Sequence, residues 1–187
     1  GLVGSEMCIR DSVDAMTKAV QEMGKAETFR GYGPEQGYDF LRKAIIEGDY
    51  QPYGIEIGMD EVFVSDGAKS DVGNIQELFS EDNIIAITDP VYPVYLDSNV
   101  MGGRTGQAVD GMFEKVVYLP TFAENNFSPE FPAERVDIVY LCSPNNPTGT
   151  VLSRARLAEW IKWCKENDAI LMFDSAYEAF ISTEAVS

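Results

Sequence analysis

Five short apolar runs divide the sequence, and four of them are followed by a polar or glycine- and proline-rich turn. The runs lie within residues 61–65, 83–89, 115–120, 136–142 and 169–173. They are short and almost continuously apolar, as is typical of parallel strands that are buried on both faces. We therefore expect five strands, most of them in a parallel sheet.

Between these runs, apolar residues recur at the three- and four-residue spacing of helices. The expected helices lie in residues 13–25, the second half of 29–50, residues 73–79, the later part of 91–103, and 152–167. Ser153 can cap the last of these helices. The apolar faces consist of Val13, Met16, Val20 and Met23 in the first helix, Phe40, Leu41, Ala44 and Ile45 in the second, and Leu157, Trp160, Ile161 and Cys164 in the last.

The alternation of strands and helices predicts an α/β fold with three layers, in which helices cover both faces of a mostly parallel sheet. The carboxyl ends of parallel strands share one edge, where ligands bind. Four turns follow expected strands: "SDGAK", "TDPVYP", "CSPNNPTG" and "FDSAY". We expect these turns to form one site.

Composition narrows the function classes. The 187 residues carry a net charge of −17, contain no histidine and are 45% apolar. An acidic surface of this kind repels nucleic acid and anionic membranes, so we expect neither as a partner. Without histidine, Ser-His and Cys-His catalysis cannot occur within the chain. Cys8, Cys142 and Cys164 fit no metal motif and indicate buried thiols, which favours the cytoplasm.

Both ends of the sequence look unlike parts of a finished domain. Residues 1–12 have no clear period and lack the features of a signal peptide, so we expect a non-native leader there. The sequence ends soon after the expected strand at 169–173. We expect residues 13–187 to be a fragment of one domain in a longer protein.

Two of the turns have residues that suit a phosphate and a flat ring. In "SDGAK", the backbone N–H groups of Gly67, Ala68 and Lys69 lie at an expected helix start, which suits a phosphate. Taken alone, that segment is better explained as an ordinary strand-to-helix turn. In "DPVYP", Tyr92 lies between Pro90 and Pro93 and can stack on a planar ligand, or serve only as an aromatic wedge under the loop.

The other two turns supply polar groups. Pro147 biases Asn146 toward an extended conformation, from which its amide can reach a ligand, although a simple turn is the alternative. Asp174 ends a buried strand, where a carboxylate needs a cationic partner unless it caps a helix. Together the turns suit a ligand with a phosphate, a flat ring, a ring oxygen and a ring cation. Pyridoxal 5′-phosphate has all four.

The same segments carry a family resemblance. "CSPNNPTG" and "FDSAY" resemble two blocks of the class I/II aminotransferases, which are fold-type-I pyridoxal-phosphate enzymes. Within that group, "RGYGPEQG", "SDGAKSD", "DPVYPVYLDSNV" and "DSAYEAF" are most similar to the LL-diaminopimelate aminotransferase family. The resemblance covers residues 13–187 and implies an incomplete cofactor-binding large domain.

The resemblance implies a set of cofactor contacts. Ala68 and Lys69 would bind the cofactor phosphate, and Tyr92 would stack on the pyridine ring. Asn146 would bind the ring oxygen.

The implied catalytic residues are Asp174, on the ring nitrogen, and Tyr177, on the ring oxygen. Tyr32 would reach the cofactor phosphate of the partner subunit in a homodimer with a shared active site. Glu35 would bind the distal ammonium of the substrate, because an uncharged substrate would leave its carboxylate unpaired. The resemblance also places Lys69, Tyr92 and Asn146 among the substrate-binding residues.

The chain departs from the family in one important respect. The "SFSK"-like block with the Schiff-base lysine is absent, so we expect this chain alone to be inactive. The parent would transfer an amino group between glutamate/2-oxoglutarate and tetrahydrodipicolinate/LL-diaminopimelate. The alternatives are an aminotransferase for aspartate, alanine or aromatic amino acids, and a non-catalytic α/β domain that binds phosphate ligands.

Overall fold

The computed structural model describes residues 2–181, and describes side chains from residue 9 onward. The chain divides into two compact units, residues 1–65 and 66–187. Each unit is considered by itself. Cys8 lies outside the described side chains.

The first unit consists of helices and loops. Helix α1 spans Leu2–Met23 and α2 spans Asp39–Ile45, and α2 continues into the π-helical turn Ile46–Tyr50. Short 3-10 turns follow at Gln51–Tyr53 and Met59–Glu61. The helix expected at residues 13–25 is confirmed as far as Met23, although its apolar residues are exposed. The boundary expected at residue 12 falls within this helix and stays a prediction.

The face that α2 buries differs from the expected one. Phe40, Leu41 and Ala44 are exposed, whereas Arg42 and Ile46 are buried. Arg42 is held by Asp39 Oδ1 at 2.6 Å, by Gln36 Oε1 at 3.0 Å and by the Met59 carbonyl oxygen at 2.7 Å. A guanidinium with this many acceptors can be buried, and apolar spacing alone does not reveal such acceptors.

The second unit is the predicted α/β sandwich. Its sheet has the order β4-β1-β5-β6, and every neighbouring pair is parallel. The strands are β1 Ile85–Asp89, β4 Val116–Pro120, β5 Ile138–Cys142 and β6 Ile170–Asp174, with a small hairpin of β2 Ala108–Val109 and β3 Met112–Phe113. The helices are α3 Ala68–Ile75, α4 Pro93–Met101 and α5 Arg154–Glu166, with 3-10 turns at Gln76–Leu78, Ala123–Asn125 and Glu178–Phe180.

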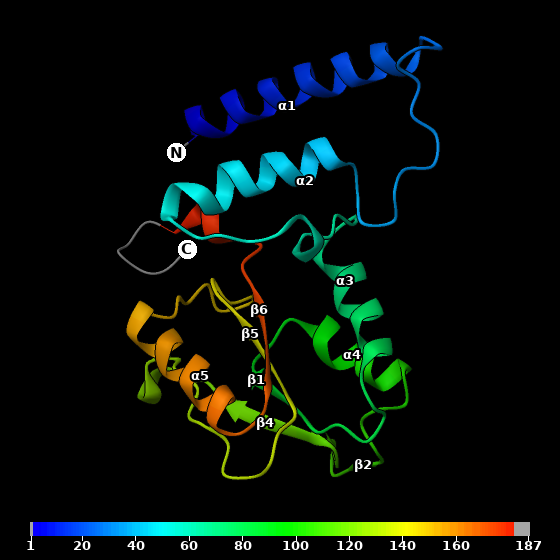
Figure 1. Cartoon of the computed structure of the whole chain (residues 1–187). Coiled ribbons are helices and arrows are strands. Elements are labelled where there is room, and N and C mark those ends of the chain that lie inside the picture. Colours follow the sequence, from blue (N-terminus) through cyan, green and yellow to red (C-terminus); the bar gives the residue numbers. More distant parts are fainter. Residues whose placement is uncertain (1, 182–187) are drawn as a thin grey trace. The chain divides into compact units, whose positions relative to one another are not determined.

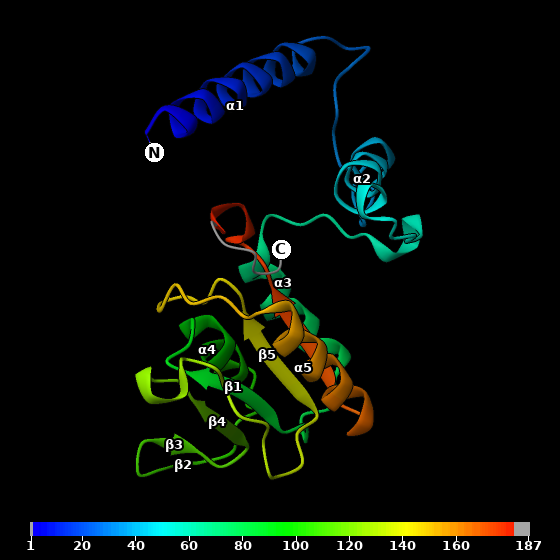
Figure 2. The same cartoon turned by 90° about the vertical axis from the view of Figure 1, so that its left-hand side faces the viewer.

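Helices cover both faces of this sheet, which confirms the three layers. Figure 1 shows α5 on one side of the strands and α3 with α4 on the other, and Figure 2 shows the unit turned by 90°. Alternate residues of each strand face opposite layers. Ile85 and Tyr140 pack in the cluster that contains Tyr95 of α4, whereas Val139 packs with Trp160 of α5.

The expected helix at 152–167 is confirmed, together with its cap. The Ser153 hydroxyl accepts a hydrogen bond from the backbone N–H of Arg156 at 3.2 Å. Trp160 and Cys164 are buried as expected, but Ile161 is 41% exposed. Trp163 is half-buried and packs in its place, in contact with Trp160 and Phe131.

Two predictions about residues 61–79 were wrong. Residues 62–65 form no strand, and the backbone N–H of Val64 donates instead to the carbonyl of Gln36 at 3.0 Å. The helix expected at 73–79 begins earlier, at Ala68, and tightens into a 3-10 turn at Gln76–Leu78. Of the four turns expected to form the site, three therefore follow strands of the sheet. The fourth, "SDGAK", leads into helix α3.

None of the helices in the described part of the chain is long and apolar enough to cross a membrane.

Candidate active site

The carboxyl edge of the sheet has a cavity of about 360 Å³. It lies among the start of α3, the side of α4 and the end of β6. Its lining includes Ala68, Val72, Tyr95, Tyr140, Asp174 and Ala176. A cavity of this size fits a small cofactor, and a largely apolar lining with a few polar groups, here including the carboxylates of Asp71 and Asp174, is typical of such sites.

Asp174 is the less exposed of these two carboxylates. It is the last residue of β6, is half-buried, and pairs with Cys142 of β5. Its Oδ1 accepts the backbone N–H of Ala176 at 3.0 Å, and its Oδ2 accepts the hydroxyl of Tyr95 at 2.7 Å. Each oxygen thus has one donor from the protein and a further lone pair for a ligand.

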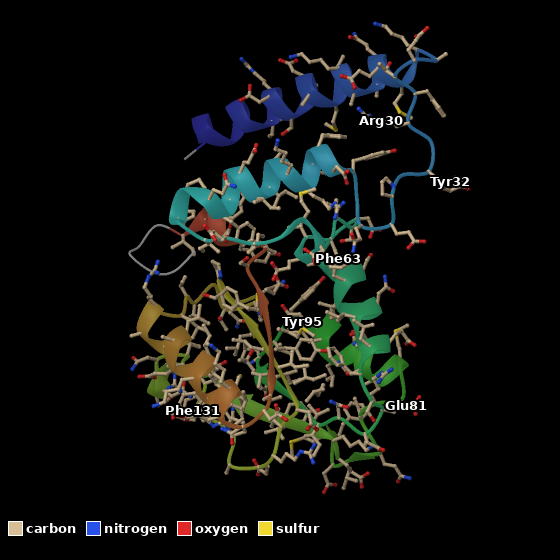
Figure 3. The ribbon with its side chains drawn as sticks, in the orientation of Figure 1. Arg30, Tyr32, Phe63, Glu81, Tyr95 and Phe131 are labelled. Atoms are coloured by element: carbon tan, nitrogen blue, oxygen red, sulfur yellow. The ribbon has the colours of Figure 1, made fainter. Side chains whose placement is uncertain are left out.

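Tyr95 is fixed from several sides. The residue is 1% exposed, and its ring stacks on Tyr140 with 5.2 Å between the centroids. Burial, and then the hydrogen bond to Asp174, raise the pKa of Tyr95 far above its usual value. The phenol therefore stays protonated and remains a donor. Figure 3 shows Tyr95 directed into the interior of the second unit, beside the strands.

The expected phosphate residues lie at the start of α3. Gly67 caps this helix with φ 137°, a backbone conformation that favours glycine. The backbone N–H groups of Ser70 and Asp71 donate to the Gly67 carbonyl. The N–H groups of Ala68 and Lys69 come before them in the first turn, where a helix can present donors to an anion. Ala68 lines the cavity that contains Asp174. The Lys69 side chain is exposed.

Tyr92 caps the start of α4, one helical turn before Tyr95. The two rings meet edge to face, with 5.7 Å between their centroids. Tyr92 is half-buried. One helix thus carries both the ring expected to stack on the cofactor and the phenol bound to Asp174.

Asn146 and Tyr177 line a second cavity of about 460 Å³, together with Pro144 and Phe180. The peptide bonds Ser143–Pro144 and Asn146–Pro147 are cis. Tyr177 is 43% exposed. The structure thus brings Asn146 and Tyr177 to one cavity, and Ala68 and Asp174 to the other.

Tyr32 and Glu35 belong to the first unit. Both are exposed, in the loop between α1 and α2, and Figure 3 shows Tyr32 pointing away from the ribbon there. They are not part of either cavity described above. Their expected roles stay predictions.

Tyr95 was missed in the sequence analysis. Its signal was its spacing of three residues after Tyr92, which places both rings on one side of a helix. The other missed residue is Cys142, whose thiol is buried at the end of β5 and donates to the Pro144 carbonyl at 3.1 Å. Burial raises the pKa of this thiol. Cys142 and Cys164 are both free and buried, as expected.

Known proteins resemble this chain along most of its length. LL-diaminopimelate aminotransferase of Methanosphaera stadtmanae is 61% identical over 175 residues, which cover 93% of this chain and 43% of that protein. The enzyme of the same name from Phocaeicola vulgatus is 58% identical over 170 residues, with coverages of 91% and 42%. The chain thus spans less than half the length of these relatives.

Solved structures give the same picture. L,L-diaminopimelate aminotransferase from Chlamydomonas reinhardtii matches with a TM-score of 0.83 and 39% identity, over 92% of this chain and 42% of that one. Aspartate aminotransferase from Thermotoga maritima matches with a TM-score of 0.77 and 25% identity, over 92% and 44%. The family model described as "Aminotransferase class I and II" matches residues 6–187. The chain therefore belongs to the class I and II aminotransferase family.

Proposed function

We propose that the protein containing this chain is a pyridoxal-phosphate-dependent LL-diaminopimelate aminotransferase. The observation that carries the cofactor assignment is the half-buried Asp174 carboxylate, which shares a cavity with the first turn of α3. The substrate assignment is supported by relatives of that name. Their sequences are 57–61% identical to this one, over alignments that cover at least 90% of this chain.

The residues at the cavity suit the cofactor. A phosphate needs backbone donors at a helix start, and Ala68 and Lys69 offer them. A protonated pyridine nitrogen needs a carboxylate, and Asp174 keeps unused acceptor capacity on both oxygens. Between these two groups, the cavity walls are largely apolar, which suits an aromatic ring.

Each residue then has a role that follows from its chemistry. Bound pyridoxal phosphate supplies an electron sink for the carbanion that forms when an amino acid loses its α-proton. Asp174 would hold the proton on the ring nitrogen, which the sink requires. Tyr92 would orient the ring by stacking. Asn146 and Tyr177 would fix the ring oxygen by hydrogen bonds.

The substrate and the partner subunit involve the first unit. Glu35 would select the distal ammonium of diaminopimelate, while Lys69, Tyr92 and Asn146 would contribute to the rest of the substrate site. Tyr32 would bind the cofactor phosphate of the partner in a homodimer. An acidic enzyme of amino-acid biosynthesis with buried free thiols is consistent with a cytoplasmic location.

The main rival is an aminotransferase for aspartate, alanine or aromatic amino acids. The aspartate aminotransferase neighbour has the same fold, so the fold alone does not choose between these substrates. The much higher identity to diaminopimelate enzymes favours the first proposal, as does the "GYGPEQG" segment that contains Glu35.

The cofactor assignment is tested by Asp174→Ala in the full-length enzyme. Transamination should fall by orders of magnitude, because a neutral pyridine is a poor electron sink. Asp97→Ala, which removes an exposed carboxylate from α4, is the matched control and should retain activity. Turnover of both variants is measured with diaminopimelate and 2-oxoglutarate. Near-normal turnover of the Asp174 variant would refute the assignment.

A further inference from the structure

The buried phenol of Tyr95 is a polar group that the roles above do not use. It makes a 2.7 Å hydrogen bond to Asp174 Oδ2, although the two residues lie 79 positions apart in the sequence. The bond joins α4 on one face of the sheet to the end of β6. Tyr95 and Asp174 both line the cavity, so Tyr95 acts on the carboxylate from the cavity wall.

The surroundings leave Tyr95 little freedom. Tyr140 stacks on one face of its ring at an interplanar angle of 17°, and Tyr92 meets it edge-on at 85°. The backbone carbonyl of Tyr95 accepts the buried Asn99 amide at 2.7 Å. A phenol packed in this way aims its hydroxyl in one direction at little cost in side-chain entropy.

Asp174 depends on such support because of its position. It is the last residue of β6, and its carboxylate can rotate about a broad terminal torsion. The backbone N–H of Ala176, in the turn after β6, donates to one carboxylate oxygen of Asp174, and the Tyr95 hydroxyl donates to the other. With both bonds made, the plane of the carboxylate is fixed relative to the cavity.

We propose that Tyr95 is a positioning residue that orients the Asp174 carboxylate and keeps its negative charge in place for the ring nitrogen of the cofactor. This inference rests on the proposed function. A hydrogen bond donated to a carboxylate stabilises its charged form. In a carboxylate–pyridinium pair, Tyr95 would therefore favour the proton on the ring nitrogen rather than on Asp174. Tyr92 and Tyr95, one turn apart on α4, would set the ring plane and the ring charge together.

Tyr95→Phe in the full-length enzyme tests this role, because it removes only the hydroxyl. Affinity for pyridoxal phosphate should fall by about tenfold, the size of one hydrogen bond to a charged group. With ¹⁵N-labelled cofactor, the ring-nitrogen resonance should move toward the value of neutral pyridine. The substrate KM should change less than kcat. Tyr118→Phe is the matched control, because Tyr118 is half-buried, its hydroxyl accepts the Phe113 N–H at 3.3 Å, and it is not among the residues that line either cavity.

A double-mutant cycle separates the possible failures. In an Asp174→Ala background, Tyr95→Phe should change cofactor affinity less than twofold, because Tyr95 acts through Asp174. Equal effects in both backgrounds would show that Tyr95 has a merely structural role and would overturn the inference. If Asp174→Ala itself leaves the nitrogen resonance and the affinity unchanged, the proposed function fails instead. The experiment thus distinguishes failure of the proposed cofactor role of Asp174 from failure of the proposed positioning role of Tyr95.

Discussion

At the scale of single residues, the proposed substrate choice would depend on Glu35, a carboxylate in an exposed loop. Glu35→Gln in the full-length enzyme should lower kcat/KM for diaminopimelate, because the amide cannot pair with the distal ammonium. A charged contact of this kind is worth about 2–5 kcal/mol when one partner is removed. The kcat/KM of the glutamate half-reaction should remain unchanged, because glutamate has no distal ammonium. Single-turnover kinetics with each substrate make the comparison.

Glu56→Gln is the control for this experiment, since it removes an equally exposed carboxylate from the same unit. It should leave both half-reactions unaltered. Equal losses for diaminopimelate and glutamate in the Glu35 variant would mean that the residue supports the loop rather than the substrate.

Single residues also mark the limit of what the sequence could predict. Asp174 was identifiable because a carboxylate at the end of an apolar strand needs a partner. Its actual partner in the fold, Tyr95, was not identifiable, because nothing local connects residues so distant in sequence. Arg42 shows the same limit, since its burial depends on the Met59 carbonyl, 17 residues away.

At the scale of elements, a carboxylate joins two strands at the amino-terminal edge of the sheet. Asp137 lies just before β5, and its Oδ2 accepts a 2.8 Å hydrogen bond from the backbone N–H of Ile84, just before β1. The other oxygen, Oδ1, accepts a hydrogen bond from the Arg135 guanidinium. Burial pushes the pKa of Asp137 upward, but the hydrogen bonds from Ile84 and Arg135 outweigh it and hold the pKa below its usual value. The ionised form therefore stabilises the folded state.

Asp137→Asn should therefore destabilise the chain in a pH-dependent way. A depressed pKa gives stability that is present above the unfolded value of about 3.9 and is lost as the pH falls through the folded value. The variant should cost about 1–2 kcal/mol near neutral pH, and the difference should shrink below about pH 4. Urea unfolding at several pH values measures this, with Asp97→Asn as the control for losing one charge. A difference that grows toward low pH would contradict the assignment.

Elements were predicted well where the pattern was strong and local. Strands β1, β4, β5 and β6 form at the expected apolar runs, and Ser153 caps α5 as its position indicated. Burial is complete along β5, whereas β6 is only half-buried. Residues 62–65 are also an apolar run, but they form no strand. A strand needs a neighbour for its backbone groups, and the described part of the chain gives Val64 a loop carbonyl instead.

At the scale of the whole molecule, the placement of the lysines decides whether this chain can bind the cofactor covalently. Lys18, Lys25 and Lys43 belong to the first unit. In the second unit, Lys115 pairs with Asp82 at 3.0 Å before β4, at the amino-terminal edge of the sheet. Lys162 is exposed and pairs with Glu166 on α5.

The remaining lysines lead to the same conclusion. Lys165 is exposed on α5, and Lys69 is exposed at the start of α3, where it would face the cofactor phosphate rather than the cofactor carbonyl. An imine with the cofactor aldehyde needs an amine held at that carbonyl carbon. We therefore expect the 187-residue chain to bind pyridoxal phosphate only reversibly, through the groups around Asp174.

Borohydride reduction tests this expectation. The purified chain is mixed with pyridoxal phosphate, reduced, digested and mapped by mass spectrometry, and the full-length enzyme is treated in parallel. The full-length enzyme should carry one label per chain at a single lysine, because its imine is held in one geometry. The 187-residue chain should carry only sparse label spread over several exposed lysines, in proportion to their accessibility. A single lysine labelled stoichiometrically in the shorter chain would show that one of its seven amines reaches the carbonyl carbon, against the placement described above.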